Sequence, residues 1–462
     1  MKRYLHFFII LLVSALLVLS GCDLLGGDDD DDDTTDDTTL KVGDASPDVD
    51  GFTVTYVDEA GGYFAENEDE DQVLVWGRFE EDIKFTDDKT WILGNAVFIG
   101  NNAQDPDNAA GNTLEIEAGT TIKGEVDDET PGVLIITRGS DIDAVGTADK
   151  PIVFTSLNEP GERAAGDWGG LILNGYARVQ GGYAEGEGGT GEYGGGSDPI
   201  DDDNSGTIKY VVVQFAGTLF SPDNELNGIV FQGIGSGTTV EYIQVHQNAD
   251  DGIEFFGGSV QVKYYVGTGN QDDTLDGDDG WNGSAQFAIL QHYPTSAGSL
   301  IEADGDATDV FPPANAVLAN ITAVGSSATD SGFRFKSNAE YDMYNSVIEM
   351  TDAANDKPVA TDELDGENST IEYEGVFAYG GTIDDTSLST GTANASGVEA
   401  GKAALTNGEY SFDFDNVPTD SDSAATVPSE DPAGNPMVDT DYVGAYDGTN
   451  AWWEDWTSFP AN

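Results

Sequence analysis

The chain has 462 residues, of which 87 are acidic and 17 are basic, so its formal net charge at pH 7 is −70. Such a surface repels the phosphates of nucleic acids and of anionic membranes, which argues against both as ligands. The 59 glycines, 21 Phe and 18 Tyr are typical of an all-β chain with many tight turns, and the single cysteine leaves no partner for an internal disulfide.

The acidic residues occur in every segment of the chain and not only in one tail. Their mutual repulsion is easiest to tolerate where the Debye length falls to about 3 Å, as it does near 1 M salt. We therefore expect a halophilic protein that works in a very salty medium. The alternative is an ordinary protein with an acidic tail.

Residues 1–22 predict an export signal that ends in a lipid attachment site. Lys2 and Arg3 precede an apolar stretch that runs to Leu19, and Ser20, Gly21 and Cys22 follow. A basic start, an apolar core and small residues before a cleavage point form a secretory signal. The ending resembles the lipobox of bacterial lipoproteins, so we expect lipid on Cys22 to anchor the protein to the outer membrane. A transmembrane helix is the alternative, but the apolar run is short for a span of about 20 residues.

Residues 23–50 contain six consecutive aspartates, from Asp28 to Asp33. Like charges at this density do not condense, so we expect an extended, disordered tether. In some lipoprotein lineages, acidic residues after the lipidated cysteine also mark export to the outer face of the membrane. A plain spacer is the alternative.

Four short apolar runs begin at Leu114, Val133, Ile152 and Leu171, each nineteen residues after the last. Runs of this length that are rich in Val, Ile and Leu and bounded by turn residues predict strands. A fixed period near twenty predicts a solenoid with one such position per coil. We expect a parallel β-helix over residues 91–350, with about a dozen coils of about 20 residues, and all four runs on adjacent rungs.

Three flanking segments complete the predicted architecture. Residues 51–90 are expected to form an N-terminal β cap that covers the first coil, with a small separate β-domain as the alternative. Residues 351–440 are expected to be a loop-rich segment along the side of the solenoid. Residues 441–462 are rich in aromatics and are expected to plug the last coil, although Trp452, Trp453 and Trp456 could instead form a carbohydrate-stacking platform.

A four-residue pattern (Gly, apolar, any residue, Phe) begins at Gly228, Gly252 and Gly332. In a strand, the two apolar positions are two residues apart and point into the same core. The residue between them and the residue after the Phe then point outward. This places Glu254 and Phe256 on the outside of one coil and Arg334 and Lys336 on the outside of another.

The segments from Gly161, Asp203, Ser221 and Asp250, and the ending from Asp441, resemble a group of secreted or lipid-anchored bacterial proteins. The most specific element is Gly-Asp-Trp-Gly-Gly at residues 166–170. The resemblance implies a right-handed parallel β-helix and carries no assigned activity. By its own chemistry the motif predicts a coil corner, with Asp167 as a turn cap, Trp168 as a large contact, and two glycines that admit a neighbouring backbone.

An excess of acidic residues marks one turn, where five lie within eight positions: Asp272, Asp273, Asp276, Asp278 and Asp279. Hard oxygen ligands at short spacing in a glycine-containing turn are those that Ca²⁺ prefers, although the EF-hand spacing is absent. Structural Ca²⁺ is therefore the one cofactor that the sequence suggests. A solvated turn of a halophilic protein is the alternative.

An enzyme must also be considered, because Asp250 and Asp251, and Arg334 with Lys336, are similar to the Asp and Arg-x-Lys elements of polygalacturonase-like hydrolases. Two carboxylates could supply an acid and a base, and the cations could hold a sugar carboxylate. The Gly-His-Gly element of that family is missing, however, and a strongly acidic groove repels a polyuronate.

The Gly-rich segment 181–206 interrupts the repeat and is expected to be a projecting loop, either a binding loop or an insertion without function. Together these observations favour a lipid-anchored cell-envelope protein whose rigid β-helix presents loops for adhesion or glycan binding, with no catalysis and no nucleic-acid partner. A polysaccharide hydrolase or lyase on the same fold is the alternative.

Overall fold

The computed structural model describes residues 51–126, 131–221, 224–305, 314–336, 339–350, 357–363, 370–379, 405–406, 409–410 and 424–460. The predicted signal, Cys22 and the predicted tether lie outside these residues, as does most of 380–423. Residues 40–462 form one compact unit, to which all the described residues belong. Within the described part of the chain, no helix is long and apolar enough to cross a membrane.

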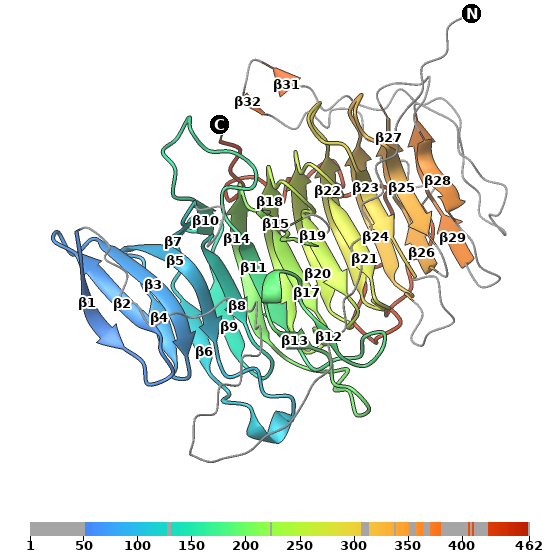
Figure 1. The fold of residues 1–462 in the computed structure, drawn as a ribbon. Helices are drawn as coiled ribbons and strands as arrows, with labels where there is room; N and C mark the ends of the chain where they lie inside the picture. Colours follow the sequence, from blue (N-terminus) through green and yellow to red (C-terminus); the bar gives the residue numbers. More distant parts are fainter. Residues whose placement is uncertain are drawn as a thin grey trace, which may run out of the picture. The chain divides into compact units, whose positions relative to one another are not determined.

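The fold is an all-β parallel β-helix (Figure 1), in which strands of successive coils lie side by side in the order of the sequence. The strand pairing divides each coil among three parallel sheets. Sheet 1 contains β4 (Ile83–Phe85), β6 (Thr113–Ile116), β9 (Asp141–Val145), the first halves of β14 (Gly206–Gln214), β18 (Thr239–His246), β20 (Gln261–Thr268), β22 (Ser284–Gln291) and β24 (Val317–Val324), and then β26 (Glu340–Tyr344) and β29 (Thr370–Glu374).

Sheets 2 and 3 complete each coil. Sheet 2 contains the first halves of β3 (Gln72–Phe79) and β5 (Thr90–Ile99), then β7 (Thr121–Gly124), β10 (Ile152–Ser156), the second halves of β14, β18, β20, β22 and β24, and then β27 (Val347–Glu349) and β30 (Phe377–Tyr379). Sheet 3 contains the second halves of β3 and β5, then β8 (Val133–Ile136), β11 (Gly170–Asn174), β17 (Ile229–Gln232), β19 (Ile253–Phe256), β21 (Leu275–Asp278), β23 (Ser299–Ala303), β25 (Ser331–Lys336) and β28 (Lys357–Glu363).

Short elements outside the three sheets lie in connecting loops. They are η1 (Pro106–Asn108) and η2 (Glu187–Gly189), and the antiparallel pairs β12 (Ala184–Glu185) with β13 (Glu192–Tyr193), β15 (Leu219–Ser221) with β16 (Asn224–Glu225), and β31 (Leu405–Thr406) with β32 (Glu409–Tyr410). At the N-terminal end, β1 (Phe52–Val57) and β2 (Tyr63–Asn67) pair in antiparallel fashion with each other and with β3. The parallel coils therefore begin at Gln72, inside the segment expected to be the cap.

The four apolar runs do not lie on one face. Leu114 is in sheet 1, Ile152 is in sheet 2, and Val133 and Leu171 are in sheet 3. The prediction that all four occupy adjacent rungs is therefore wrong, although each run is a parallel strand of the β-helix. Because a coil carries three strands, a spacing of nineteen residues joins different sheets. From Leu114 to Val133, for example, the chain passes from sheet 1 to sheet 3.

The true coil is longer and less regular than predicted. Register partners are 28 residues apart at Thr113 and Asp141 and 22 residues apart at Thr239 and Gln261. Between residues 91 and 350, the described part of the chain gives sheet 3 strands from eight coils (β5, β8, β11, β17, β19, β21, β23 and β25) in place of the expected dozen. Parallel pairing also continues to β28, β29 and β30, within the segment expected to be loops.

The repeated Gly-apolar-x-Phe pattern forms sheet 3 and its core, as predicted. Ile229 pairs with Ile253 and Phe231 pairs with Phe255, and all four side chains are fully buried. The rings of Phe231 and Phe255 stack at 5.4 Å. The middle residue of each pattern points away from this core, which fixes what the outer face of sheet 3 displays.

From β14 to β27, the chain turns between sheets 1 and 2 at a single residue with positive φ. Earlier coils have connections of several residues at this corner, as from Val145 at the end of β9 to Ile152 at the start of β10. The single residue is Tyr210, Tyr242, Tyr264, Phe287, Asn320 or Asn345 in successive coils, with φ between 47° and 63°. We call these six residues the corner ladder. Their aromatic rings stack from coil to coil, with centroids 4.5, 4.3 and 5.0 Å apart. A left-handed conformation costs a bulky residue about 1–2 kcal/mol, which stacking of this kind offsets by about 0.5–1.5 kcal/mol per pair.

The C-terminal segment 424–460 lies along the corner ladder. Its first part, up to residue 440, was expected along the side of the solenoid, whereas the part from residue 441 was expected over the last coil. Trp456 meets Tyr210 and Tyr242 edge to face, at 5.9 and 6.2 Å. At the other end of the ladder, Asn345 Nδ2 donates to Ala425 O at 2.9 Å. The segment covers apolar surface on the side of the solenoid, because the exposed edges of the ladder rings lie there.

The Gly-Asp-Trp-Gly-Gly motif forms a coil corner, as its chemistry predicts. Asp167 accepts hydrogen bonds from Ser156 Oγ at 2.5 Å and from the backbone N–H of Ala164 at 3.0 Å. Trp168 is fully buried and donates from Nε1 to Gln214 O at 2.8 Å. A Cβ on Gly170, whose φ is +97°, would lie 2.1 Å from the carbonyl oxygen of Asn227, so only glycine fits there.

Candidate functional site

The outer face of sheet 3 changes its chemistry from coil to coil at one register position. The residues that pair in sequence along the sheet at this position are Phe98, Ile135, Ile172, Val230, Glu254, Asp276, Glu302 and Arg334. Four apolar side chains are thus followed by three carboxylates and then by a guanidinium group. Glu254 and Arg334 point outward, as predicted.

A second line of side chains lies just before the strands of sheet 3. Asp251 N donates to Asn227 Oδ1 at 3.0 Å, Asp273 N donates to Asp251 Oδ1 at 2.8 Å, and Ser299 N donates to Asp273 Oδ1. Each side chain thereby binds the backbone of the next coil. This ladder holds Asp251 and Asp273 in fixed positions and leaves a second oxygen on each carboxylate.

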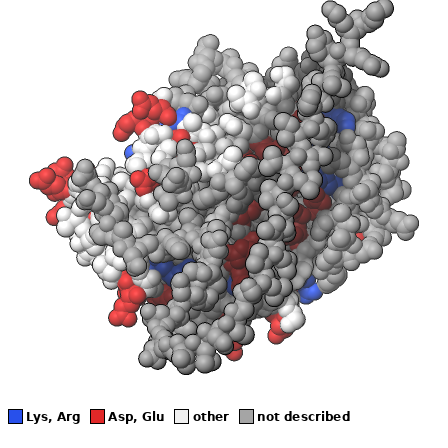
Figure 2. All heavy atoms as spheres, viewed as in Figure 1, with Lys and Arg blue, Asp and Glu red and all other residues white. Residues whose placement is uncertain are grey.

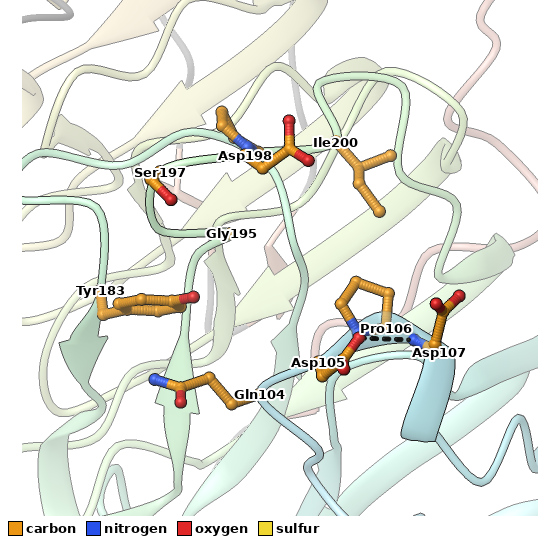
Figure 3. Close-up of a pocket in the computed structure, with 10 residues that line it drawn as sticks. Gln104, Asp105, Pro106, Asp107, Tyr183, Gly195, Ser197, Asp198 and Ile200 are labelled. Atoms are coloured by element: carbon orange, nitrogen blue, oxygen red, sulfur yellow. Dashed lines mark hydrogen bonds between the residues drawn. The ribbon is translucent and has the colours of Figure 1, made fainter.

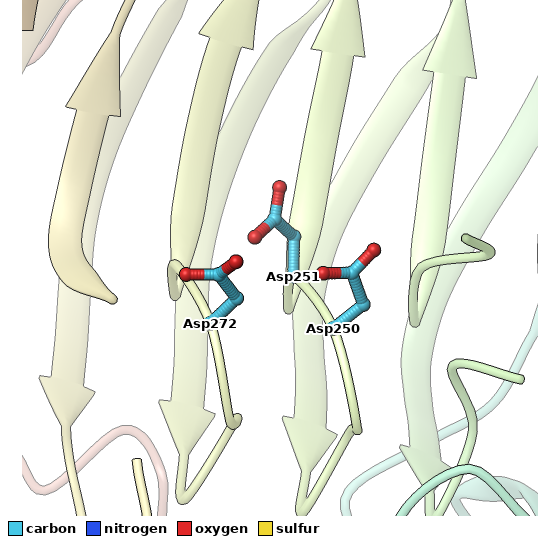
Figure 4. Close-up of side chains that lie close together, drawn as sticks. All are labelled: Asp250, Asp251 and Asp272. Carbon is cyan, nitrogen blue, oxygen red and sulfur yellow. The ribbon is translucent and has the colours of Figure 1, made fainter. Parts of the chain in front are cut away.

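Together these positions and their neighbours form a continuous group on three coils. We call it the carboxylate row: Asp250, Asp251, Glu254, Asp272, Asp273, Asp276 and Glu302. Three sets within it have one ligand atom per residue within 4.8 Å of the others: Asp250 with Asp251 and Asp272, Asp251 with Glu254 and Asp276, and Asp273 with Asp276 and Glu302. Figure 4 shows the first set, in which Asp250 and Asp251 come from one turn and Asp272 from the next.

The row is largely withdrawn from solvent. The exposed fraction is 8% for Asp251, Glu254 and Asp276, 6% for Asp273 and 7% for Glu302. Figure 2 shows a band of acidic side chains on the middle of the face that Figure 1 presents, with basic side chains toward one end of it. Buried like charges at these distances oppose ionisation strongly.

The pKa values of the row reflect this environment. Burial, followed by the charge of Glu302, raises the pKa of Asp276 well above its usual range, and burial followed by the charge of Asp273 does the same for Asp251. Burial, with Glu225 and Asp272 nearby, raises the pKa of Asp250 to about 8. At neutral pH the row must therefore bind protons or another cation, or remain strained by repulsion.

Among the residues that the structure describes, basic side chains meet the row only at its C-terminal end. Arg334 Nη1 lies 3.7 Å from Glu302 Oε2, Lys336 pairs with Glu302, and Lys336 Nζ lies 3.8 Å from Asp304 Oδ2. The strands of Asp251 and Arg334 are three coils apart, which is about 14 Å at a strand spacing of about 4.8 Å. The two predicted pairs of catalytic residues therefore share one face but not one reaction centre.

The insertion between β11 and β14, expected as a loop over residues 181–206, lies against the outer face of sheet 3. Asn174 Nδ2 donates to Thr190 O at 3.0 Å, and Tyr193 Oη donates to Asp279 Oδ2 at 3.0 Å. Glu187 of the same insertion lies close enough to raise the pKa of both Asp250 and Glu254, after burial and nearer carboxylates. The insertion thus adds a further carboxylate to the surroundings of the row.

The five aspartates singled out by their spacing divide into two groups. Asp272, Asp273 and Asp276 belong to the row, whereas Asp278 bonds the backbone N–H of Asp279 and Asp279 accepts from Tyr193. Spacing alone did not join Glu254 and Glu302 to these aspartates. The signal that could have found both is the register of sheet 3, because each occupies the outward position between two core residues of its strand.

The three tryptophans proposed as a sugar platform are engaged by the chain itself. Trp453 and Trp456 are 8% and 1% exposed, and Trp456 Nε1 donates to Trp452 O at 2.8 Å. Trp452 is half-buried and meets Tyr264 edge to face at 5.3 Å. Their ring faces are therefore not displayed as an open platform, because they pack on the corner ladder and on each other.

Comparison with known proteins gives one match. A search of curated proteins and a search of solved structures each found no match. The family model described as a pectate-lyase-like β-helix domain matches residues 77–457, which include nearly all of the three sheets, the carboxylate row and most of the C-terminal segment. The chain belongs to the family of pectate-lyase-like β-helix domains.

Proposed function

We propose that this protein is a lipid-anchored protein of the bacterial cell envelope, exposed on the outer face, that acts as a binding scaffold. In this proposal the carboxylate row holds Ca²⁺, and the bound ions bridge the acidic protein to an anionic partner such as an acidic glycan. The observation that carries the proposal is the arrangement of seven carboxylates on adjacent coils of sheet 3, most of them buried.

The donor set fits Ca²⁺ in number and in chemistry. Ca²⁺ takes six to eight oxygen ligands, including carboxylates. Asp251 belongs to the first and second sets of the row, and Asp276 belongs to the second and third. Asp276 is 92% buried, yet its Oδ1 has no hydrogen-bond partner among the described residues. An unpartnered carboxylate oxygen in such surroundings is costly unless a cation or a proton meets it.

The positions of the basic side chains support binding over catalysis. Lys336 and Arg334 already face Glu302, so they are partly neutralised. Asp250 and Asp251 lie about 14 Å away along the sheet, which is too far for the four residues to act on one glycosidic bond. A chain-like ligand that follows the outer face could contact both ends of the row.

Calorimetric titration of Ca²⁺ into the chelator-treated protein tests the proposal. We expect saturable binding to the wild type and at least tenfold weaker binding to Asp276→Asn. The matched control is Asp143→Asn, because Asp143 is an exposed aspartate on β9 of sheet 1, outside the row. Acidic oligosaccharides should then bind only in the presence of Ca²⁺. Equal Ca²⁺ binding by both variants and the wild type would contradict the role of the row.

A polysaccharide lyase or hydrolase is the second candidate. The adjacency of Glu302 and Arg334 on neighbouring strands favours it, and the family match is compatible with it. A metal ion held beside a guanidinium group could stabilise a sugar carboxylate and assist proton abstraction. Release of reducing ends and double-bond absorbance on a panel of glycans, with Asp251→Asn and Asp276→Asn as inactive controls, would reveal such an activity.

The cellular location and the salt requirement need separate tests. Metabolic labelling with a fatty acid should mark the wild type but not Cys22→Ser, and protease added to intact cells should reach the protein.

The net charge of −70 predicts that the midpoint of unfolding rises with NaCl up to molar concentrations, since added salt screens repulsion between carboxylates. A midpoint that is independent of NaCl would remove the halophilic part of the proposal.

A further inference from the structure

A cavity lies apart from the carboxylate row, between two loops on the outside of the solenoid (Figure 3). Its volume is about 520 Å³, which is within the range of small-ligand sites, about 300–1,000 Å³. One wall is the loop that follows β5 and contains η1, and the other is the insertion between β11 and β14. None of the residues that line the cavity belongs to the row.

A buried arginine holds the two walls together. Arg138, which is fully buried, donates from Nε to Asn102 Oδ1 at 3.2 Å on one wall. On the other wall it donates from Nη1 to Gly194 O at 3.2 Å and from Nη2 to Glu192 Oε2 at 3.0 Å. A guanidinium group with several fixed bonds is rigid. The cavity is therefore built before any ligand arrives, which lowers the entropic cost of binding.

The aromatic ring of Tyr183 lies at the cavity. Tyr183 is 42% exposed and packs on Gly196, where a Cβ would lie 2.2 Å from the ring. Pro106 and Ile200 add apolar surface around the same space. Flat, partly apolar ring faces of this kind suit the apolar face of a pyranose sugar.

The charged groups of the cavity are all acidic. Its lining includes Asp105, Asp107 and Asp198 and no basic side chain. Asp105 caps η1 by accepting from the backbone N–H of Asp107 at 3.1 Å, whereas the carboxylates of Asp107 and Asp198 form no ion pair with any described residue. A uronate or a phosphorylated ligand would be repelled here, and a ligand with hydroxyl donors and a positive charge is favoured.

We propose that this cavity binds an amino sugar, a pyranose that carries a protonated amine. The ring packs against Tyr183, and the amine pairs with Asp107 and Asp198. The site does not rest on the proposed function of the carboxylate row, and it would take a ligand of opposite charge to an acidic glycan. A glucosamine unit within a longer glycan meets both requirements.

The probe is the glucosamine trimer, titrated by calorimetry into the full-length mature protein at pH 5.5 and 0.5 M NaCl with chelator present. The salt suppresses nonspecific attraction to the acidic surface. We expect a Kd below about 1 mM, which corresponds to about −4 kcal/mol, and at least tenfold weaker binding of the N-acetylated trimer, which has the same rings without charge.

Variants then locate the site. Tyr183→Ala, and Asp107→Asn combined with Asp198→Asn, should each weaken binding at least tenfold, and Tyr183→Phe should stay within twofold because the ring remains. The matched control combines Asp143→Asn with Asp149→Asn, an equal loss of charge at exposed positions elsewhere, and should bind like the wild type. Unchanged thermal unfolding of each variant would show that the loops are intact.

Two results would overturn the proposal. The first is binding that the cavity variants and the control weaken equally, which would mean attraction to the acidic surface as a whole. The second is trilysine binding as tightly as the glucosamine trimer with the same dependence on Asp107 and Asp198, which would make the cavity a site for a cationic peptide. Because the titration contains no Ca²⁺, its failure would leave the proposal for the row untouched.

Discussion

The carboxylate row and the corner ladder are two external lines of similar side chains, both built by stacking equivalent positions of successive coils. In the corner ladder, Tyr210, Tyr242 and Tyr264 stack at 4.5 and 4.3 Å, and the chain covers them with its own C-terminal segment. In the row, Asp251, Glu254 and Asp276 come within 4.8 Å of one another as like charges. The rings of the corner ladder are packed by the chain itself, whereas the carboxylates of the row need a cation to offset their repulsion.

The difference follows from the geometry of a β-helix. Every side chain meets its equivalent in the next coil at about 4.8 Å. Any attraction or repulsion between two like residues is therefore repeated from coil to coil. Aromatic pairs gain about 0.5–1.5 kcal/mol each, whereas pairs of carboxylates repel. We therefore regard the corner ladder as the part of the surface that stabilises the chain, and the row as the part adapted to binding.

The largest expected effect comes from removing the residue that joins the tail to the ladder. Trp456 is 1% exposed, and Trp456→Ala should lower the free energy of unfolding by about 3–5 kcal/mol, as is usual for a buried large aromatic. Chemical denaturation measures the loss. Glu454→Ala, an exposed change in the same segment, should stay within about 0.5 kcal/mol. A small effect of Trp456→Ala would mean that the tail does not stabilise the solenoid.

The next largest effect is the stabilisation of the protein by Ca²⁺ bound to the carboxylate row. Saturating Ca²⁺ at about 100 times its Kd should raise the free energy of unfolding by about 2.7 kcal/mol per site. Asp276→Asn should lose most of this gain, while its stability in chelator should not fall, because it removes one of several repelling charges. Asp143→Asn should keep the gain. Thermal or chemical unfolding with and without Ca²⁺ provides the measurement.

A smaller effect is expected at the end of the ladder. Asn345 is fully buried, has a φ of 47°, and exchanges two hydrogen bonds with Ala425, at 2.9 and 2.7 Å. Asn345→Ala should cost about 1–3 kcal/mol, because it leaves the backbone groups of Ala425 without partners and places alanine in a left-handed conformation. Asn345→Gly keeps the backbone freedom, so the difference between the two variants isolates the conformational part.

The smallest effect per pH unit is a change in the slope of stability with pH. A carboxylate whose pKa is raised by folding binds more protons in the folded state, so its contribution to stability is present below about pH 4 and is lost as the pH rises. Since the pKa of Asp250 is raised to about 8, the loss should extend from about pH 4 to about pH 8. In chelator, Asp250→Asn should reduce the slope by up to about 1.4 kcal/mol per pH unit.

Ca²⁺ offers a check on this slope. When the ion replaces protons as the counter-charge of the row, stability should fall less steeply with pH than it does in chelator. Trp456→Ala should leave the slope unchanged, because Tyr210 and Tyr242, which it contacts, carry no carboxylate. A slope that is the same in the wild type, in Asp250→Asn and with Ca²⁺ would show that the row does not control proton uptake on folding.

Much of the fold could be predicted from local sequence, but its period could not. The Gly-apolar-x-Phe pattern correctly gave core positions such as Ile253 and Phe255 and outward positions such as Glu254. The equal spacing of the four apolar runs was misleading, since coils range from 22 residues at Thr239 and Gln261 to longer ones with loops. Loop lengths vary freely outside the sheets, so strand spacing along the chain does not measure a coil.

The candidate site was found in fragments that only the register could join. The pairs Asp250 with Asp251 and Arg334 with Lys336 were noticed for their chemistry, and the aspartates from Asp272 onward for their density. Glu302 links these fragments, because it pairs with Asp276 on one side and Arg334 on the other. That link depends on which residues meet across coils, and a single sequence does not contain this information directly.

The one-residue turn between sheets 1 and 2 limits how such a chain can change in length. Because Tyr210, Tyr242 and Tyr264 each place a single left-handed residue between two paired half-strands, a residue added there would shift the inward and outward positions of one half against the other. In these coils, insertions fit only at the other two corners, where the large loops are found. A longer or shorter protein of this kind would therefore gain or lose whole coils. The strands of a new coil would pair with the strands of the two flanking coils.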